Sequence, residues 1–219
     1  RLDFALRPKG NRMARKIFCL GPAKSGTSSL HALFAANGLR SIHSAGNWPM
    51  PEYDCFSDRG DYRPFKAYDA TYPNAVFLLN TRPLGSYLRS LAIHRSREGS
   101  ALPAKFVNSA LLVGQARRRE AFHLRVLQHF RGRAGFLVVD IEKPGSMGFV
   151  ADRLGLTLPE VTHHHKTRDK PTPRAEAAVT EAIATLGGPG LRPSRLILTD
   201  GPETALLADL LPAPENLWL

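Results

Sequence analysis

The stretch FCLGPAKSGTSSLHALF, residues 18–34, decides the fold. It starts with apolar residues that end at Gly21, as a strand buried on both faces does. Small and hydroxyl residues surround a lysine, and Leu30, Leu33 and Phe34 then recur at helical spacing. A glycine turn between a buried strand and a helix brings backbone N–H groups together with the positive end of the helix dipole. The stretch therefore predicts a loop that binds an anion.

The rest of the chain alternates between apolar segments typical of strands and amphipathic segments typical of helices. Further strands are expected at 39–44, 74–82, 135–141 and 195–199, and helices after Pro83, near 115–131, around 149–154 and at 175–187. This alternation predicts an α/β fold, a three-layer and mainly parallel sheet flanked by helices, of the P-loop nucleotide-binding type. We expect one domain over 1–219, with its core at 16–170 and an irregular C-terminal extension from about 188 to 219.

The charge balance indicates anionic partners. Lys and Arg number 30 against 19 Asp and Glu, and a net charge of +11 attracts nucleotides, acidic glycans, anionic lipids or nucleic acid. Two cysteines, Cys19 and Cys55, are too few for a disulfide framework, so a reducing compartment fits best. No apolar run approaches the length of a membrane span. We expect a cytoplasmic protein or, alternatively, a lumenal catalytic domain whose anchor has been removed.

The loop itself departs from the ATP-binding pattern. Gly21 and Gly26 have the spacing of the G-x-x-x-x-G-K-[ST] loop, but Thr27 stands where that loop has its lysine, and Lys24 comes two residues before the second glycine. The segment AKSGTSSL, 23–30, resembles instead the PKSGTT loop of sulfotransferases that use 3′-phosphoadenosine 5′-phosphosulfate (PAPS). The resemblance implies that the 5′-phosphosulfate is held by Ala23, Lys24, Ser25, Gly26, Thr27 and Ser28.

Two further segments are similar to the same family. YPNAVFLLNTRPLGSYLRS, 72–90, resembles its 3′-phosphate segment, in which a strand ends in arginine and a serine follows eight positions later; Arg82 and Ser90 have that spacing. A guanidinium can form two parallel hydrogen bonds with a phosphate, and a serine hydroxyl can bind the same group. A weaker match, the strand, turn and helix of 136–156 followed by a basic loop, implies nucleotide contacts from Lys166 or Arg168.

The resemblance implies a PAPS-dependent sulfotransferase of the bacterial or carbohydrate type, which moves a sulfuryl group to a hydroxyl or amine of a glycan, lipid or small metabolite. Lys24 is expected to stabilise the leaving oxygen, and the arrangement requires no metal. His43 falls where glycan and tyrosine sulfotransferases place a Glu base, and histidine is a residue type that suits general-base work near neutral pH. Asp58, in a polar segment that could line the acceptor side, is the next candidate base, followed by Asp54 and His94.

Two alternatives stay open. A P-loop kinase or nucleotidase using ATP and Mg²⁺ is one, because Asp140 follows an apolar strand as a metal-binding Asp would. The other is a non-catalytic basic protein that binds anions or nucleic acid, suggested only by the net charge, although we expect no nucleic-acid partner for a sulfotransferase. The three arginines at 117–119 are expected on the solvated side of a helix, and segments 45–70 and 95–115 are expected to form the acceptor walls.

Overall fold

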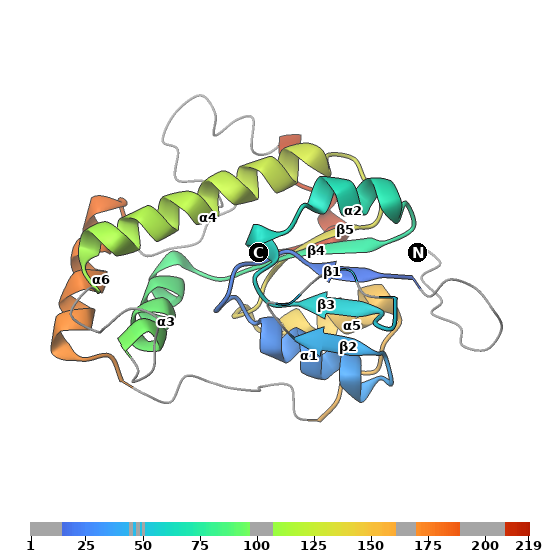
Figure 1. Cartoon of the computed structure of the whole chain (residues 1–219), viewed down its shortest axis with the longest axis horizontal. Coiled ribbons are helices and arrows are strands. Elements are labelled where there is room, and N and C mark those ends of the chain that lie inside the picture. The colour runs from blue at the N-terminus through green and yellow to red at the C-terminus, as the bar shows by residue number, and fades with distance from the viewer. Residues whose placement is uncertain are drawn as a thin grey trace. The chain divides into compact units, whose positions relative to one another are not determined.

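The structure, a computed structural model, describes residues 15–43, 46, 49, 51–96, 107–160, 170–188 and 209–219 (Figure 1). The chain divides into two compact units. The first contains the residues up to Thr81, a segment that starts at His129, and the C-terminal residues from Leu211; the second contains the rest. Neither unit is a continuous piece of sequence, and the expected single domain stays a prediction.

The first unit is built on a parallel sheet. In the described residues the strand order is β2-β3-β1-β4-β5-β6, and every neighbouring pair is parallel. The strands are β1 (Ile17–Cys19), β2 (Ser41–His43), β3 (Cys55–Ser57), β4 (Val76–Thr81), β5 (Phe136–Asp140) and β6 (Leu217–Trp218). All residues of β1, β4 and β5 are buried, because helices cover both faces of the sheet. The predicted α/β fold with helices flanking a parallel sheet is confirmed.

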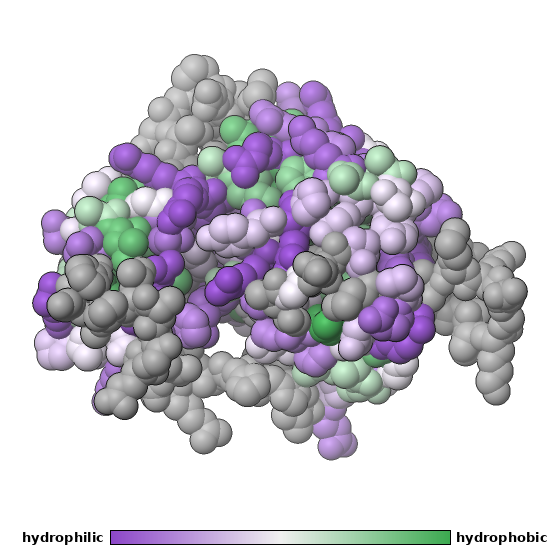
Figure 2. Space-filling view, viewed as in Figure 1, coloured by the Kyte–Doolittle hydropathy of each residue, from purple (hydrophilic) through white to green (hydrophobic). Residues whose placement is uncertain are grey.

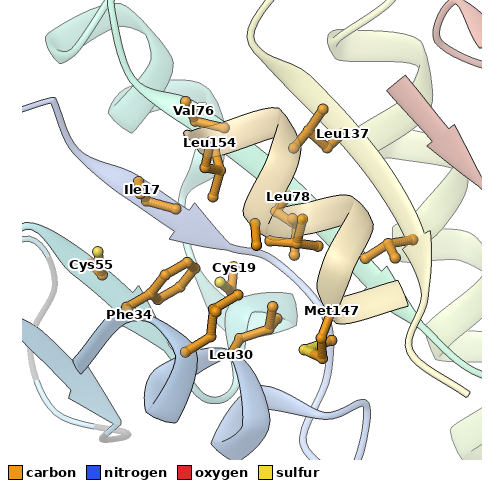
Figure 3. Packing of buried hydrophobic residues seen from close by; sticks show 14 residues of the cluster. Ile17, Cys19, Leu30, Phe34, Cys55, Val76, Leu78, Leu137, Met147 and Leu154 are labelled. Carbon is orange, nitrogen blue, oxygen red and sulfur yellow. The ribbon is translucent and has the colours of Figure 1, made fainter. Parts of the chain in front are cut away.

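One face of this sheet packs against α1 (Thr27–Ala36) and α5 (Ser146–Leu154). Figure 3 shows alternate strand residues such as Ile17 and Leu78 pointing at Phe34 and Leu154 from the two helices. Cys19 lies in the same cluster, and burial raises the pKa of its thiol. Cys19 thus packs as a small buried hydrophobic residue.

The other face carries a layer of aromatic rings. Phe18 stacks between Phe56 and Phe77, with ring centroids 5.1 and 5.2 Å away. Tyr68 from α2 (Phe65–Thr71) lies 5.0 Å from Phe18 and covers the layer. Offset and tilted rings at these separations attract one another beyond their burial of apolar area. The sheet therefore has an aliphatic side and an aromatic side, which makes its register unambiguous.

The second unit is helical. It contains α3 (Leu84–Ser96), α6 (Pro173–Thr185) and α4 (Ser109–His129) up to Gln128. Its core is a separate cluster of buried side chains that includes Leu88, Leu112 and Val179, one from each helix. Thr172 caps α6 by accepting a hydrogen bond from the backbone of Ala175.

Three features differ from the expectations. Strand β3 and helix α2 were not predicted, because three and seven residues are too short to show a period. Residues 217–218 add β6 to the sheet where irregular chain was expected, and the possible strand at 195–199 lies outside the described residues. Helix α4 begins at Ser109, six residues before the expected start at 115.

The described surface is mostly polar. On the face shown in Figure 2, hydrophilic side chains predominate and hydrophobic ones form small separate patches. Among the described residues the large exposed hydrophobic side chains are Tyr62 and Leu158. None of the helices in the described residues combines the length and apolar character needed to cross a membrane.

Candidate anion-binding site

The sheet brings several predicted residues to one edge. Because the strands are parallel, their C-terminal ends lie together. The loop that starts at Gly21 follows β1, His43 ends β2, and Asp58 follows β3 directly. From β1 the chain continues to β2 on one side of the sheet, and from β4 it continues to β5 on the other side. The strand order therefore has its switch point between the neighbouring strands β1 and β4. Open parallel sheets bind ligands at such a point.

The loop between β1 and α1 has an unusual backbone. Lys24 has a φ of 71°, in the left-handed region that side chains other than glycine rarely adopt, and Gly26 has a φ of 81°. Ser25 stabilises the turn, since its hydroxyl and its backbone N–H both donate to the carbonyl of Pro22, at 2.5 and 3.2 Å. Strained residues held in place by their surroundings gather at functional sites.

Asn80 of β4 closes this loop from the neighbouring strand. Its Oδ1 accepts from the backbone N–H of Gly21 at 2.9 Å, and its Nδ2 donates to the carbonyl and hydroxyl oxygens of Ser25 at 2.8 and 2.7 Å. A Cβ at Gly21 would lie 2.2 Å from the carbonyl oxygen of Asn80, so only glycine fits there. The buried amide thus has partners at both ends and fixes the start and the middle of the loop.

Ser25 is 1% exposed, and its hydroxyl is used within the loop. Its side chain has a structural role here, and its contact with a cosubstrate stays a prediction. Gly26 is confined in another way, since a Cβ there would lie 2.9 Å from the side chain of Ile141, just after β5. The loop is therefore packed against the ends of two strands besides its own.

Helix α1 begins immediately after the loop, at Thr27. The first N–H groups of a helix have no acceptor within it, and the helix dipole makes that end positive. Thr27 is buried and Ser28 is half-buried, and the Nε2 atom of His43 lies 3.1 Å from the Thr27 hydroxyl and 3.2 Å from the Ser28 hydroxyl. Two adjacent loop residues and a histidine from the next strand, all three predicted from the sequence, thus come together at the helix N-terminus.

A second histidine, His31, was not predicted from the sequence and lies beside His43. His31 lies one turn after Thr27 on α1, its Nδ1 is 2.9 Å from the hydroxyl of Ser41, and its ring centroid is 5.8 Å from that of His43. Burial lowers the pKa of His31, and the neighbouring His43 lowers it further. The i, i+4 spacing of Thr27 and His31 is the signal that could have indicated it.

Asp58 belongs to a segment that packs on the end of β1. Asp58 and Arg59 have φ values of 90° and 51°, and the N–H of Gly60 donates to the carbonyl of Gly21 at 3.1 Å. A Cβ at Gly60 would lie 2.3 Å from the carbonyl oxygen of Cys19. The half-buried Asp58 carboxyl is thus attached to a tightly packed turn at the loop edge of the sheet.

Asp54 lies at the opposite edge, because it precedes β3. It forms a two-point ion pair with Arg40, with distances of 2.6 and 2.9 Å. Burial raises the pKa of Asp54, but the hydrogen bonds and charge of Arg40 outweigh it, so the pKa is lowered. The strand direction therefore separates Asp54 from the loop.

Asp140, the residue behind the kinase hypothesis, ends β5, and its Oδ1 accepts from the backbone N–H of Glu142 at 2.9 Å. Within the described ranges, no three His, Cys, Asp or Glu side chains gather to hold a metal ion.

The other predicted residues belong to the second unit or lie outside the description. Arg82 follows β4 directly in the chain, and its carbonyl accepts from Arg119 at 3.2 Å. Ser90 is buried on α3, and His94 is exposed near the end of that helix. The residues of the weaker match, Lys166 and Arg168, lie outside the described residues.

The expectation for the three arginines of α4 is wrong at one position. Arg117 and Arg118 are exposed, but Arg119 is 3% exposed and points into the second unit. Successive helical residues are rotated by about 100°, so one of three adjacent side chains can face inward.

Taken together, the loop edge offers backbone N–H groups, two hydroxyls, a lysine and a histidine, a donor-rich set that fits an oxyanion with several acceptor oxygens. No model of a known protein family matches the chain, and a search of curated proteins found no match.

Proposed function

We propose that this protein is a PAPS-dependent sulfotransferase that transfers a sulfuryl group to a hydroxyl or amine of an acceptor. The observation that carries the proposal is the loop closed by Asn80, which leads into a helix N-terminus where Thr27, Ser28 and His43 lie together. The resemblance of segments 23–30 and 72–90 to the PAPS-binding segments of that family supports it.

The residues at the loop edge suit a phosphosulfate. In this proposal the N–H groups of Thr27 and Ser28 and their hydroxyls bind the 5′-phosphate, since both kinds of donor lie at the positive end of α1. Lys24 binds the oxygen that bridges phosphorus and sulfur, where negative charge develops on transfer. Ser29 stands where the cytosolic sulfotransferases have an aromatic residue that stacks on adenine, so in this proposal the adenine contact comes from another part of the chain.

The transfer needs positioning, charge stabilisation and a base. The acceptor oxygen or nitrogen forms a bond to sulfur while the bond between sulfur and the bridging oxygen breaks, and the acceptor proton passes to the base. His43 is the first candidate, although its Nε2 also lies against the loop hydroxyls and holds them in place. Asp58, at the same edge of the sheet, is the second candidate.

Binding of the desulfated product tests the proposal without knowledge of the acceptor. Calorimetry should detect adenosine 3′,5′-bisphosphate binding in the absence of metal, and Lys24→Ala should weaken it roughly tenfold or more, as loss of a charge-assisted contact does. Lys66→Ala, a change of an exposed lysine on α2, is the matched control and should bind normally. Preference for ATP–Mg²⁺ over the bisphosphate would favour the kinase hypothesis instead.

A screen of hydroxyl- and amine-bearing acceptors with radiolabelled PAPS addresses the chemistry. His43→Ala and Asp58→Asn should then be compared for turnover and for bisphosphate affinity. The base is the residue whose loss lowers turnover about a hundredfold or more and lowers turnover much more than bisphosphate affinity. If neither change affects turnover, the assignment of a base at this edge is wrong.

A further inference from the structure

Helix α4 carries a buried ion pair that the proposed chemistry does not use. Arg119 and Glu120 are each 3% exposed, and the Nε of Arg119 donates to Oε1 of Glu120 at 2.8 Å. Other residues of the same helix, among them Leu112 and Ala116, contribute apolar side chains to the core of the second unit. A charged pair in such surroundings is costly to bury compared with apolar residues of similar volume.

Stability alone does not explain this pair. The Nη2 of Arg119 and the Oε2 of Glu120 have no hydrogen-bond partner within the described residues, and the Nδ1 of buried His123 lies 3.8 Å from that Oε2, so neither group of the pair is fully satisfied by hydrogen bonds. A buried ion pair contributes to stability only when its geometry and additional hydrogen bonds offset the loss of water. The pair therefore calls for another explanation, and the remaining contacts of Arg119 supply one.

The guanidinium of Arg119 holds the point where α3 starts. Its Nη1 donates to the carbonyl oxygen of Arg82 at 3.2 Å, and its Cζ lies 4.7 Å from the ring centroid of Tyr87. Tyr87 is buried on α3, and Arg82 precedes that helix by two residues. One rigid, planar group thus contacts Glu120 on its own helix, a backbone carbonyl and an aromatic face.

We infer that Arg119 is a positioning residue for recognition of the cosubstrate's 3′-phosphate, acting by fixing the backbone of Arg82. This inference rests on the proposed function and on the resemblance of segment 72–90, which implies that the Arg82 side chain binds that phosphate. A guanidinium recognises phosphate through paired hydrogen bonds, which tolerate little error in direction. Holding the Arg82 carbonyl restricts the backbone from which the side chain extends, and Glu120 keeps Arg119 in place to do so.

The test compares two nucleotides that differ only in the group concerned. Calorimetric affinities for adenosine 3′,5′-bisphosphate and adenosine 5′-monophosphate give a ratio that reports recognition of the 3′-phosphate. Arg119→Met should lower this ratio about tenfold, an ordinary single-residue coupling, and leave the monophosphate affinity unchanged. Glu120 can take up a proton once Arg119 is gone, so this variant leaves no buried charge. Leu112→Ala removes buried side-chain volume from the same helix and is the control for a general loss of packing. It should leave the ratio equal to that of the unaltered protein.

A double-variant cycle decides whether Arg119 acts through Arg82. Arg82→Ala should lower the ratio at least as much, and Arg119→Met should then add nothing to it. Independent, multiplicative losses would overturn the inference, as would an equal drop in Leu112→Ala. Arg119→Lys provides a second variant that keeps the positive charge without the planar fork; a ratio equal to that of the unaltered protein would also overturn it. If the unaltered protein shows no preference for the bisphosphate, the proposed function itself fails, which is a different result.

Discussion

The two units of this protein bury polar side chains in opposite ways. In the sheet unit the fully buried Asn80 is neutral, and both ends of its amide have partners in the loop. In the helical unit Arg119 and Glu120 are ionisable, and each has an atom without a hydrogen-bond partner in the part of the chain that the structure describes. The first arrangement closes the loop between β1 and α1 at little cost in free energy, whereas the second carries a large desolvation cost.

The difference concerns what happens when one partner is removed. Removing the partner of a neutral buried group lowers the free energy of unfolding by about 1–3 kcal/mol. Removing the partner of a buried charge lowers it by more, about 3–5 kcal/mol. The helical unit should therefore be the more sensitive of the two to a single polar substitution, although its core is no less apolar elsewhere.

The largest effect should come from stranding the positive charge. Glu120→Leu leaves Arg119 buried without its counter-charge, and because arginine cannot release its proton, the free energy of unfolding should fall by about 3–5 kcal/mol. Urea unfolding at pH 8, above the pKa of about 7 that burial gives Glu120, followed by far-ultraviolet circular dichroism, measures it. The double variant Arg119→Met/Glu120→Leu should recover most of the loss. Equal losses in the single and double variants would show that charge is not the cause.

A pH series should sharpen the same contrast. Burial raises the pKa of Glu120 from 4.5 to about 7, although the charge and hydrogen bond of Arg119 oppose the shift. The folded state then keeps a proton that the unfolded state loses above 4.5. This stabilisation is complete below pH 4.5 and is lost as the pH rises through 7, up to a value on the order of 3 kcal/mol.

Glu120→Gln removes the titrating group and is the reference for this series. The unfolding free energy of the unaltered protein relative to Glu120→Gln should fall between pH 5 and pH 8. A constant difference across that range would mean that Glu120 is ionised throughout and that Arg119 outweighs burial.

A smaller loss is expected in the sheet unit from Asn80→Ala. The change leaves the Gly21 N–H without its acceptor and the Ser25 oxygens without their donor, which should cost about 1–3 kcal/mol. Because the loop is no longer closed, affinity for adenosine 3′,5′-bisphosphate should fall as well. Ser25→Ala removes one of these contacts and should have a smaller effect on both measurements. Unchanged bisphosphate affinity in Asn80→Ala would show that closing of the loop by Asn80 is not needed for binding.

The smallest effect should come from the ion pair of the sheet unit. Arg40 is 57% exposed at its side chain, so its pair with Asp54 is screened by water, and Arg40→Ala should lower the free energy of unfolding less than Asn80→Ala does. Bisphosphate binding should be unchanged, since the pair lies at the sheet edge opposite the loop. A loss as large as that of Glu120→Leu would show that burial does not set the contrast between the units.

Much of the fold could be predicted because its signals are local. The apolar runs of β1, β4 and β5 and the helical period of α1 each depend on neighbouring residues, and all four were found near their observed bounds. The two-residue strand β6 gives no such signal, because it exists only through its pairing with β5.

The candidate site was predictable in part for the same reason. The loop from Ala23 to Ser28 is a continuous motif, and His43 was selected by its place at the end of a strand. The role of Asn80 was missed, although an amide within an otherwise apolar strand is a signal that could have indicated it. The burial of Arg119 had no signal of its own among three consecutive arginines.

By itself the sequence determined that strands and helices alternate and that a glycine-bounded loop with a lysine joins the first pair, because these depend on residues within a few positions of one another. Only the tertiary structure decided the strand order, the closing of the loop by Asn80, the meeting of His43 with Thr27, and the separation of Asp54 from that edge. These contacts join residues 16 to 59 positions apart or depend on strand direction, and the packing of the sheet, not local preference, selects among them.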